Sequence, residues 1–141
     1  DLVHTKDLFH QFTISDYLFT KCLLFAKVNL PEEEFRLYQK LFEIIHQQIT
    51  QPDLLIYLHA PVQKLQENIK KRQRVYEQSI SDEYLFNLQQ TYTHYIKQHN
   101  IKTLFIDASN ADFLGNEKQL KVIIDALEND YEDGQHYLTL P

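Results

Sequence analysis

Glycine is scarce in this sequence: the 141 residues include only Gly115 and Gly134. A phosphate-binding loop of the form G-x-x-x-x-G-K-[ST] needs two glycines five positions apart, and the dinucleotide fingerprint G-x-G-x-x-G needs three glycines. The chain therefore contains neither motif. Methionine is also absent, and the sequence opens on a polar segment, Asp1–Lys6. We expect the chain to be an internal piece of a longer protein.

Other scarcities narrow the class of protein further. Cys22 is the only cysteine, which excludes a disulfide framework and a thiolate zinc cluster and suits a reducing cytoplasm. The histidines are scattered without an H-x-x-x-H pair, so no metal site is expected. The longest nearly uncharged stretches, 22–26 and 54–58, are far shorter than the roughly 20 apolar residues of a membrane span. The net charge of −6 argues against binding to duplex nucleic acid. We expect a soluble cytoplasmic protein without membrane or nucleic-acid partners.

Short β-prone runs alternate with segments of helical periodicity, which predicts an α/β fold with a parallel sheet. Strands are expected near 11–15, 53–59 and 102–107. The predicted helices cover 18–27, 31–49, 61–69, 82–96 and 117–127. The helix at 18–27 is apolar nearly all round, so we expect it to lie in a core or in a subunit contact. We assign 1–129 to the domain and 130–141 to an acidic, mobile tail.

A cluster of basic residues lies where two predicted helices join. Four cations and one carboxylate occur in Lys70–Glu77. Arg72 and Arg74 would lie about 200° apart around a continuous helix, so both can face one anion only where the helix ends. A lid over phosphates meets this requirement, since the arginine fork donates in pairs to phosphate oxygens. A solvated basic helix end, favoured by the helix dipole, is the alternative.

Asp16, Asp107 and Asp112 lie at or after predicted strand ends, where parallel sheets place ligand-facing groups. Taken singly, such acids also serve as caps or turn residues.

Together these segments resemble the deoxynucleoside kinase family over about 12–127. Ile69-Lys-Lys-Arg-Gln-Arg-Val-Tyr-Glu-Gln78 is similar to the family's lid, R-x-R-x-x-E, and Asp107-Ala-Ser-Asn-Ala-Asp-Phe113 looks like its loop around the donor adenine. Ser15-Asp16-Tyr17-Leu18 is similar to the segment after the third strand, where members usually carry an acid, an arginine and a serine. Tyr17 replaces that arginine, and Lys21 or Cys22 occupies the region of the acid that helps to read the base.

The resemblance implies a partial P-loop-kinase-like three-layer fold and assigns roles to six residues. Arg72 and Arg74 would be catalytic, holding the donor phosphates and the charge that develops on the transferred group. Asp16 and Glu77 would bind the deoxynucleoside, Glu77 through its sugar. Asp112 and Phe113 would contact the donor adenine. ATP and Mg²⁺ would be the cofactors of the full-length protein, and the P-loop and catalytic carboxylate are expected upstream of Asp1.

Two hypotheses on function remain at this point. In the first, the full-length protein transfers the γ-phosphoryl group of ATP to the 5′-hydroxyl of a deoxynucleoside, and this piece alone is inactive. In the second, the piece is an oligomerisation or accessory module with a degenerate site, as Tyr17 suggests. It could follow a 2-amino-4-hydroxy-6-hydroxymethyldihydropteridine pyrophosphokinase of folate biosynthesis. We expect a homodimer through the helix at 18–27, because the family's first strand, which joins the strands at 12 and 54, is missing here.

Overall fold

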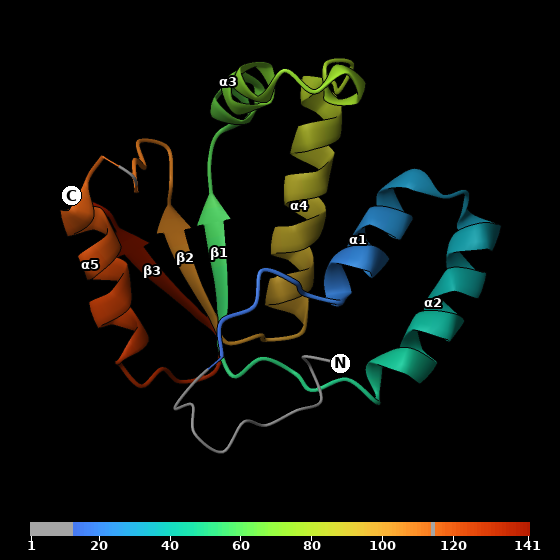
Figure 1. Ribbon diagram of the computed structural model, residues 1–141. Coiled ribbons are helices and arrows are strands. Elements are labelled where there is room, and N and C mark those ends of the chain that lie inside the picture. The colour runs from blue at the N-terminus through green and yellow to red at the C-terminus, as the bar shows by residue number, and fades with distance from the viewer. Residues whose placement is uncertain (1–12, 114) are drawn as a thin grey trace. The chain divides into compact units, whose positions relative to one another are not determined.

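The computed structural model of the chain describes residues 13–113 and 115–141 (Figure 1). The chain divides into two compact units, Asp1–Pro52 and Asp53–Pro141, here called the N-terminal and C-terminal units. The polar opening at 1–6 and the first residues of the strand expected at 11–15 lie outside the described residues. No helix within the described residues is long and apolar enough to cross a membrane.

The N-terminal unit contains a pair of packed helices, α1 (Thr20–Asn29) and α2 (Glu32–His46). Pro31 directly precedes α2, and three glutamates in its first turn complement the positive end of the helix dipole. Phe42 is 5% exposed and stacks on Phe19 with ring centroids 4.9 Å apart. The predicted helices are confirmed, although α2 ends at His46 instead of 49.

The strand expected at 11–15 is wrong for its described part, since residues 13–15 adopt no strand structure. Ser15 forms a local turn instead: its hydroxyl donates to the Tyr17 carbonyl at 3.0 Å and accepts from the Tyr17 N–H at 3.1 Å. Ile14 is 72% exposed, so the apolar residue that suggested the strand is not buried. Local side-chain hydrogen bonds of serine compete with strand pairing, which explains the outcome.

The C-terminal unit contains a three-stranded parallel sheet in the order β1-β2-β3. The strands are β1 (Leu55–His59), β2 (Thr103–Asp107) and β3 (Gln135–Thr139). Helix α3 (Val62–Arg72), the 3₁₀ turn η1 (Val75–Glu77) and helix α4 (Asp82–Gln98) connect β1 to β2, and α5 (Glu117–Leu127) connects β2 to β3. The strands predicted near 53–59 and 102–107 are confirmed, and β2 is the central strand.

The two faces of the sheet carry different side chains, as period-2 alternation requires. On one face, Leu104 and Ile106 form the core with Ala126 of α5, and partly buried side chains surround them. On the other face, Tyr57 and Phe105 are in contact, and Tyr92 of α4 lies against Tyr57 with ring centroids 6.1 Å apart. Figure 1 shows α4 and α5 on opposite sides of the sheet. The result is a three-layer arrangement that confirms the predicted α/β class.

Strand β3 corrects the expectation of a tail at 130–141. Residues 135–139 pair in parallel with 103–107, and Leu138 packs against the Leu104–Ile106 core. The ladder begins where the Thr103 N–H donates to the Gly134 carbonyl at 2.8 Å. The segment contains no continuous apolar run and follows several acidic residues, so its sequence resembles a solvated tail. Pairing with the buried strand β2 determines its structure instead.

Candidate functional site

The basic cluster lies at the end of α3, beyond the carboxyl end of β1 (Figure 1). The helix ends at Arg72, and Gln73 adopts the left-handed conformation with φ of 53°. Its N–H donates to the Lys70 carbonyl, which closes the last turn. The chain then leaves the helix, so Arg74 is not held 200° away from Arg72. The helix predicted at 61–69 thus extends to Arg72, and its end lies between the two arginines, the condition under which both can face one anion.

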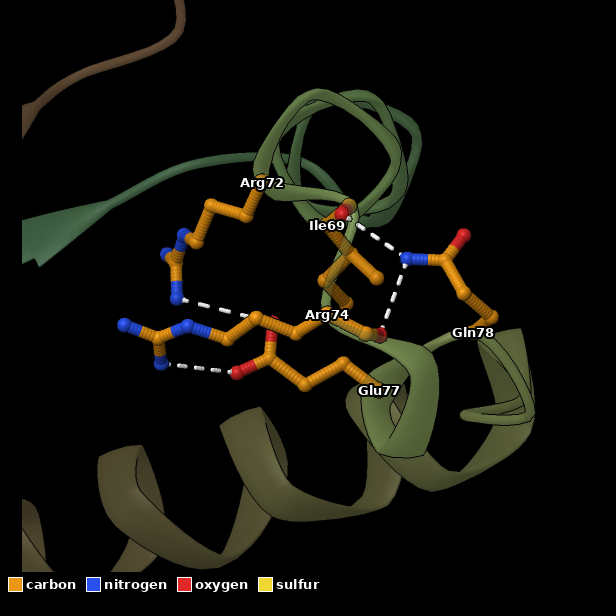
Figure 2. A network of polar contacts seen from close by, with 5 residues as sticks. All are labelled: Ile69, Arg72, Arg74, Glu77 and Gln78. Atoms are coloured by element: carbon orange, nitrogen blue, oxygen red, sulfur yellow. Dashed lines mark hydrogen bonds and ion pairs between the residues drawn. The ribbon is translucent and has the colours of Figure 1, made fainter.

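Both arginines point to the same carboxylate (Figure 2). Arg74 Nη1 donates to Glu77 Oε1 at 3.0 Å, and Arg72 Nη1 lies 3.9 Å from Glu77 Oε2. The Glu77 side chain is 13% exposed, whereas the arginine side chains are more than half exposed. The hydrogen bond with Glu77 raises the pKa of the Arg74 guanidinium above its ordinary value. Two cationic forks therefore converge on one anionic group at a surface open to solvent.

Glu77 is anchored asymmetrically. Its Oε1 accepts the Arg74 hydrogen bond, whereas its Oε2 is buried and has no hydrogen-bond partner among the described residues. The 3.9 Å separation from Arg72 is an ion pair but too long for a hydrogen bond. A buried carboxylate oxygen without a hydrogen bond is costly, so Glu77 Oε2 is available to accept one from a hydrogen-bond donor that binds here.

The backbone of this lid, residues 72–80, is held by glutamine side chains that the sequence analysis did not identify. Gln78 Nε2 donates to the carbonyls of Ile69 and Arg74 at 3.1 and 3.2 Å (Figure 2). Gln66 Nε2 donates to the Ile80 carbonyl at 2.8 Å. These bonds join the lid to α3 at both ends. The lid then leads into α4, whose first turn is capped by the Ser81 hydroxyl, which accepts from the Tyr84 N–H at 3.1 Å.

The second candidate segment, 107–116, follows β2 and is here called the donor-base loop. Asp107 Oδ1 accepts from the Ser109 N–H at 2.9 Å and from the Ser109 hydroxyl at 2.5 Å. The hydroxyl bond is the main cause of the lowered pKa of the Asp107 carboxyl. Asp107 thus organises the turn, the structural alternative weighed above for strand-end acids. Phe113 is partly buried and Asp112 is exposed.

Asp112 adopts a fixed geometry within this loop. Its Oδ1 accepts from the Gly115 N–H at 3.0 Å, and its carbonyl accepts from the Asn116 N–H at 2.8 Å. A Cβ on Gly115 would lie 2.3 Å from Asp112 Oδ2, so a larger residue at this position would have to displace the Asp112 carboxylate. The donor-base loop directly follows the carboxyl end of β2, and the lid follows α3, which begins just after the carboxyl end of β1. Open α/β sheets bind ligands at this edge.

Asp16 lies in the N-terminal unit, exposed in the turn before α1. Its neighbour Tyr17, which stands in the arginine position, has its hydroxyl 3.6 Å from Cys22 Sγ. This contact raises the pKa of the Tyr17 hydroxyl. The C-terminal unit thus contains five of the six candidate residues: Arg72, Arg74 and Glu77, which form ion pairs with one another, and Asp112 and Phe113 in the loop after β2.

Comparison with known proteins identifies the family of the chain. The deoxynucleoside kinase family matches residues 6–131, nearly the whole chain. The chain belongs to the deoxynucleoside kinase family.

Individual relatives are kinases of purine deoxynucleosides by name. The chain is 29% identical over 115 residues to a deoxyguanosine kinase of Bacillus subtilis (strain 168). This match covers 78% of this chain and 56% of that protein. It is 27% identical over 131 residues to a deoxyadenosine kinase of Lactobacillus acidophilus, covering 82% and 61%. A deoxyadenosine kinase of Dictyostelium discoideum is 30% identical over 94 residues, 67% of this chain and 38% of that protein. The chain thus spans little more than half the length of the bacterial relatives.

Proposed function

We propose that this chain forms the lid and donor-base part of an enzyme that transfers the γ-phosphoryl group of ATP to the 5′-hydroxyl of a deoxynucleoside. The observation that carries the proposal is the convergence of the Arg72 and Arg74 guanidiniums on one anionic group at the carboxyl edge of a parallel sheet. Planar forks bind phosphate oxygens in pairs and keep their charge when a lid closes over them.

In the proposed reaction the 5′-oxygen forms a bond to the γ-phosphorus while the bond from that phosphorus to the β,γ-bridging oxygen breaks. Charge accumulates on the transferred group and on the leaving oxygen. Arg72 and Arg74 stabilise this charge from positions fixed before the reaction, which is how arginines accelerate phosphoryl transfer. The proton of the 5′-hydroxyl passes to a base outside the described part of the chain.

The described residues contain no cluster of side chains that would hold Mg²⁺. Among residues 13–113 and 115–141, no group of three His, Cys, Asp or Glu side chains could hold a metal ion. We therefore assign no step of the reaction to a metal site in this chain. The chain also has no P-loop motif, so the remaining contacts to the donor phosphates come from outside it.

Glu77 is proposed to bind the sugar of the acceptor. A deoxynucleoside offers only two hydroxyls, and the 5′-hydroxyl is the one that reacts. The 3′-hydroxyl is therefore the group that would donate a hydrogen bond to Glu77 Oε2, which has no donor among the described residues. Asp16, Asp112 and Phe113 keep their proposed roles toward the acceptor and the donor adenine. Because the relatives above are named for deoxyguanosine and deoxyadenosine, we propose a purine deoxynucleoside as the substrate.

The test uses the full-length protein, ATP and each of the four deoxynucleosides. Arg72→Ala and Arg74→Ala should each lower kcat by about 10³-fold or more. Lys71→Ala is the matched control, because it removes the same charge from the neighbouring exposed position and should leave kcat nearly unchanged. Equal losses in the three variants would contradict the lid assignment. A wild-type protein that phosphorylates none of the four would favour the oligomerisation or accessory module instead.

The Glu77 role has its own substrate control. Glu77→Gln should lower kcat/KM for the deoxynucleoside, and the loss should shrink when the substrate is the 2′,3′-dideoxynucleoside, which lacks the proposed partner hydroxyl. The same loss with both substrates would mean that Glu77 acts only by holding the arginines.

A further inference from the structure

Gln119 is a buried amide on the third residue of α5, with 5% of its surface exposed. Buried amides must find hydrogen-bond partners, and this one uses both ends of its side chain. Its Oε1 accepts from the Asp112 N–H at 2.9 Å, and its Nε2 donates to the Pro141 carbonyl at 3.0 Å. One side chain thus joins the donor-base loop to the segment that follows β3.

On the loop, Gln119 bonds to Asp112, a residue proposed to contact the donor adenine. The N–H of Asp112 is held by Gln119, its carbonyl by the Asn116 N–H and its carboxylate by the Gly115 N–H. Only the first of these bonds comes from outside the loop. The Ala108 N–H also ties the start of the loop to the sheet, since it donates to the His59 carbonyl at 2.7 Å, so without the Gln119 bond only the part of the loop around Asp112 could shift.

The partner at the other end lies beyond the residues that the family match covers. The family match ends at residue 131, whereas β3 begins at Gln135. Strand β3 is in register with β2, with Thr139 opposite Asp107, so the segment after β3 emerges beside the start of the donor-base loop. Gln119 spans the gap between these two neighbours.

We propose that Gln119 is a positioning residue that fixes Asp112 and Phe113 against the C-terminal strand, so that β3 contributes to donor-nucleotide binding. The inference rests on the proposed function in one respect, namely that Asp112 and Phe113 contact the donor base. The positioning itself rests only on the two hydrogen bonds of the Gln119 amide.

The experiment compares two variants of the full-length protein. Gln119→Met keeps the length of the side chain and removes both hydrogen bonds. Gln119→Glu keeps an oxygen that can accept from the Asp112 N–H but loses the donor to Pro141. Amide hydrogen exchange of Asp112 reports the positioning, and the exchange of the Ile106 amide in β2 reports the stability of the fold.

In Gln119→Met we expect the Asp112 amide to exchange about tenfold or more faster while the Ile106 amide is unchanged. KM for ATP should rise about tenfold, and KM for the deoxynucleoside should stay within about twofold of its original value. Gln119→Glu should restore the protection of the Asp112 amide. Its KM for ATP should lie between the values of the wild type and of Gln119→Met. Should Gln119→Met fail to fold, Gln119→Glu alone decides, since the loss of the Pro141 bond should still raise KM for ATP.

Unchanged exchange of Asp112 in Gln119→Met would overturn the positioning role. Faster exchange of Asp112 with an unchanged KM for ATP would overturn the link to donor binding. A wild-type protein without kinase activity would overturn the proposed function, yet the exchange measurement would still support or refute the positioning. The two failures are therefore distinguishable.

Discussion

The backbone conformation of Gly134 predicts how much a substitution at this position should lower the free energy of unfolding. Its φ of +111° is a conformation that L side chains rarely adopt. A Cβ added there would lie 3.4 Å from Asn100 Oδ1, which is an ordinary van der Waals distance. Gly134→Ala should thus strain the backbone without creating a clash. The strain falls at the start of β3, where the Gly134 carbonyl accepts the first hydrogen bond of the ladder from Thr103.

Two opposing terms set the size of the effect. Holding a non-glycine residue in such a region costs about 1–3 kcal/mol. Alanine also lowers the conformational entropy of the unfolded chain, which stabilises the folded state by about 0.4–1 kcal/mol. We therefore expect the free energy of unfolding to fall by about 1–2 kcal/mol. For a protein of about 150 residues or more, in which 1 kcal/mol shifts Tm by about 2–4 °C, that corresponds to a drop in Tm of about 2–8 °C.

Urea and thermal unfolding of the full-length protein measure the change, and a double-mutant cycle identifies its cause. Asn100→Gly removes the one side chain near the added Cβ. If the cost is backbone strain, the coupling between Gly134→Ala and Asn100→Gly should stay within about 0.5 kcal/mol of zero. An unchanged stability of Gly134→Ala would refute the strain argument. A cost that disappears in the Asn100→Gly background would show that a steric contact, and not φ, is responsible.

Three further predictions concern other parts of the chain. Gln73→Gly should raise the free energy of unfolding by about 0.5–1 kcal/mol in urea titrations, because glycine suits the left-handed residue that ends α3. Ser109→Ala should raise the pKa of Asp107 toward its ordinary value in an NMR titration of the carboxyl. Because the folded-state pKa is lowered, the associated stabilisation is present above pH 4 or so and is lost as the pH falls through the folded pKa. Phe42→Ala should cost about 3–5 kcal/mol in thermal unfolding, whereas Leu41→Ala, 55% exposed, should cost far less.

Much of the C-terminal unit could be predicted because its signals are local. A continuous apolar run specified β2, and a polar loop followed by helical periodicity specified α5. Strand β3 lacks such a signal, since only its pairing with β2 and the packing of Leu138 distinguish it from a tail. The opposite error, a strand predicted where none forms, occurred at 11–15: the described residues 13–15 have no partner strand among the described residues. A short strand depends on its neighbours more than on its own composition.

The candidate site divides in the same way. Charge and spacing identified Arg72, Arg74 and Glu77, because cations that gather at a helix end are visible in a sequence. The residues that position the site are glutamines whose partners are backbone carbonyls or amides. Gln66 and Gln119 bond to carbonyls 14 and 22 positions away, a relation that no sequence pattern records. Sequence therefore predicted the charged groups of the candidate site and missed the glutamines that hold its backbone.

The strength of the Arg74–Glu77 pair bears on how the lid could work under the proposed function. An ion pair between a half-exposed arginine and a carboxylate contributes about 0.2–1 kcal/mol. A bidentate contact with a phosphate of higher charge is stronger, so an incoming donor can displace Glu77 from Arg74 at little cost. Before that exchange the pair holds the guanidinium near its working position. Glu77 Oε2 has no hydrogen-bond donor among the described residues, so under the proposed function it could accept a sugar hydroxyl, once the buried atom becomes accessible, while Oε1 still holds Arg74.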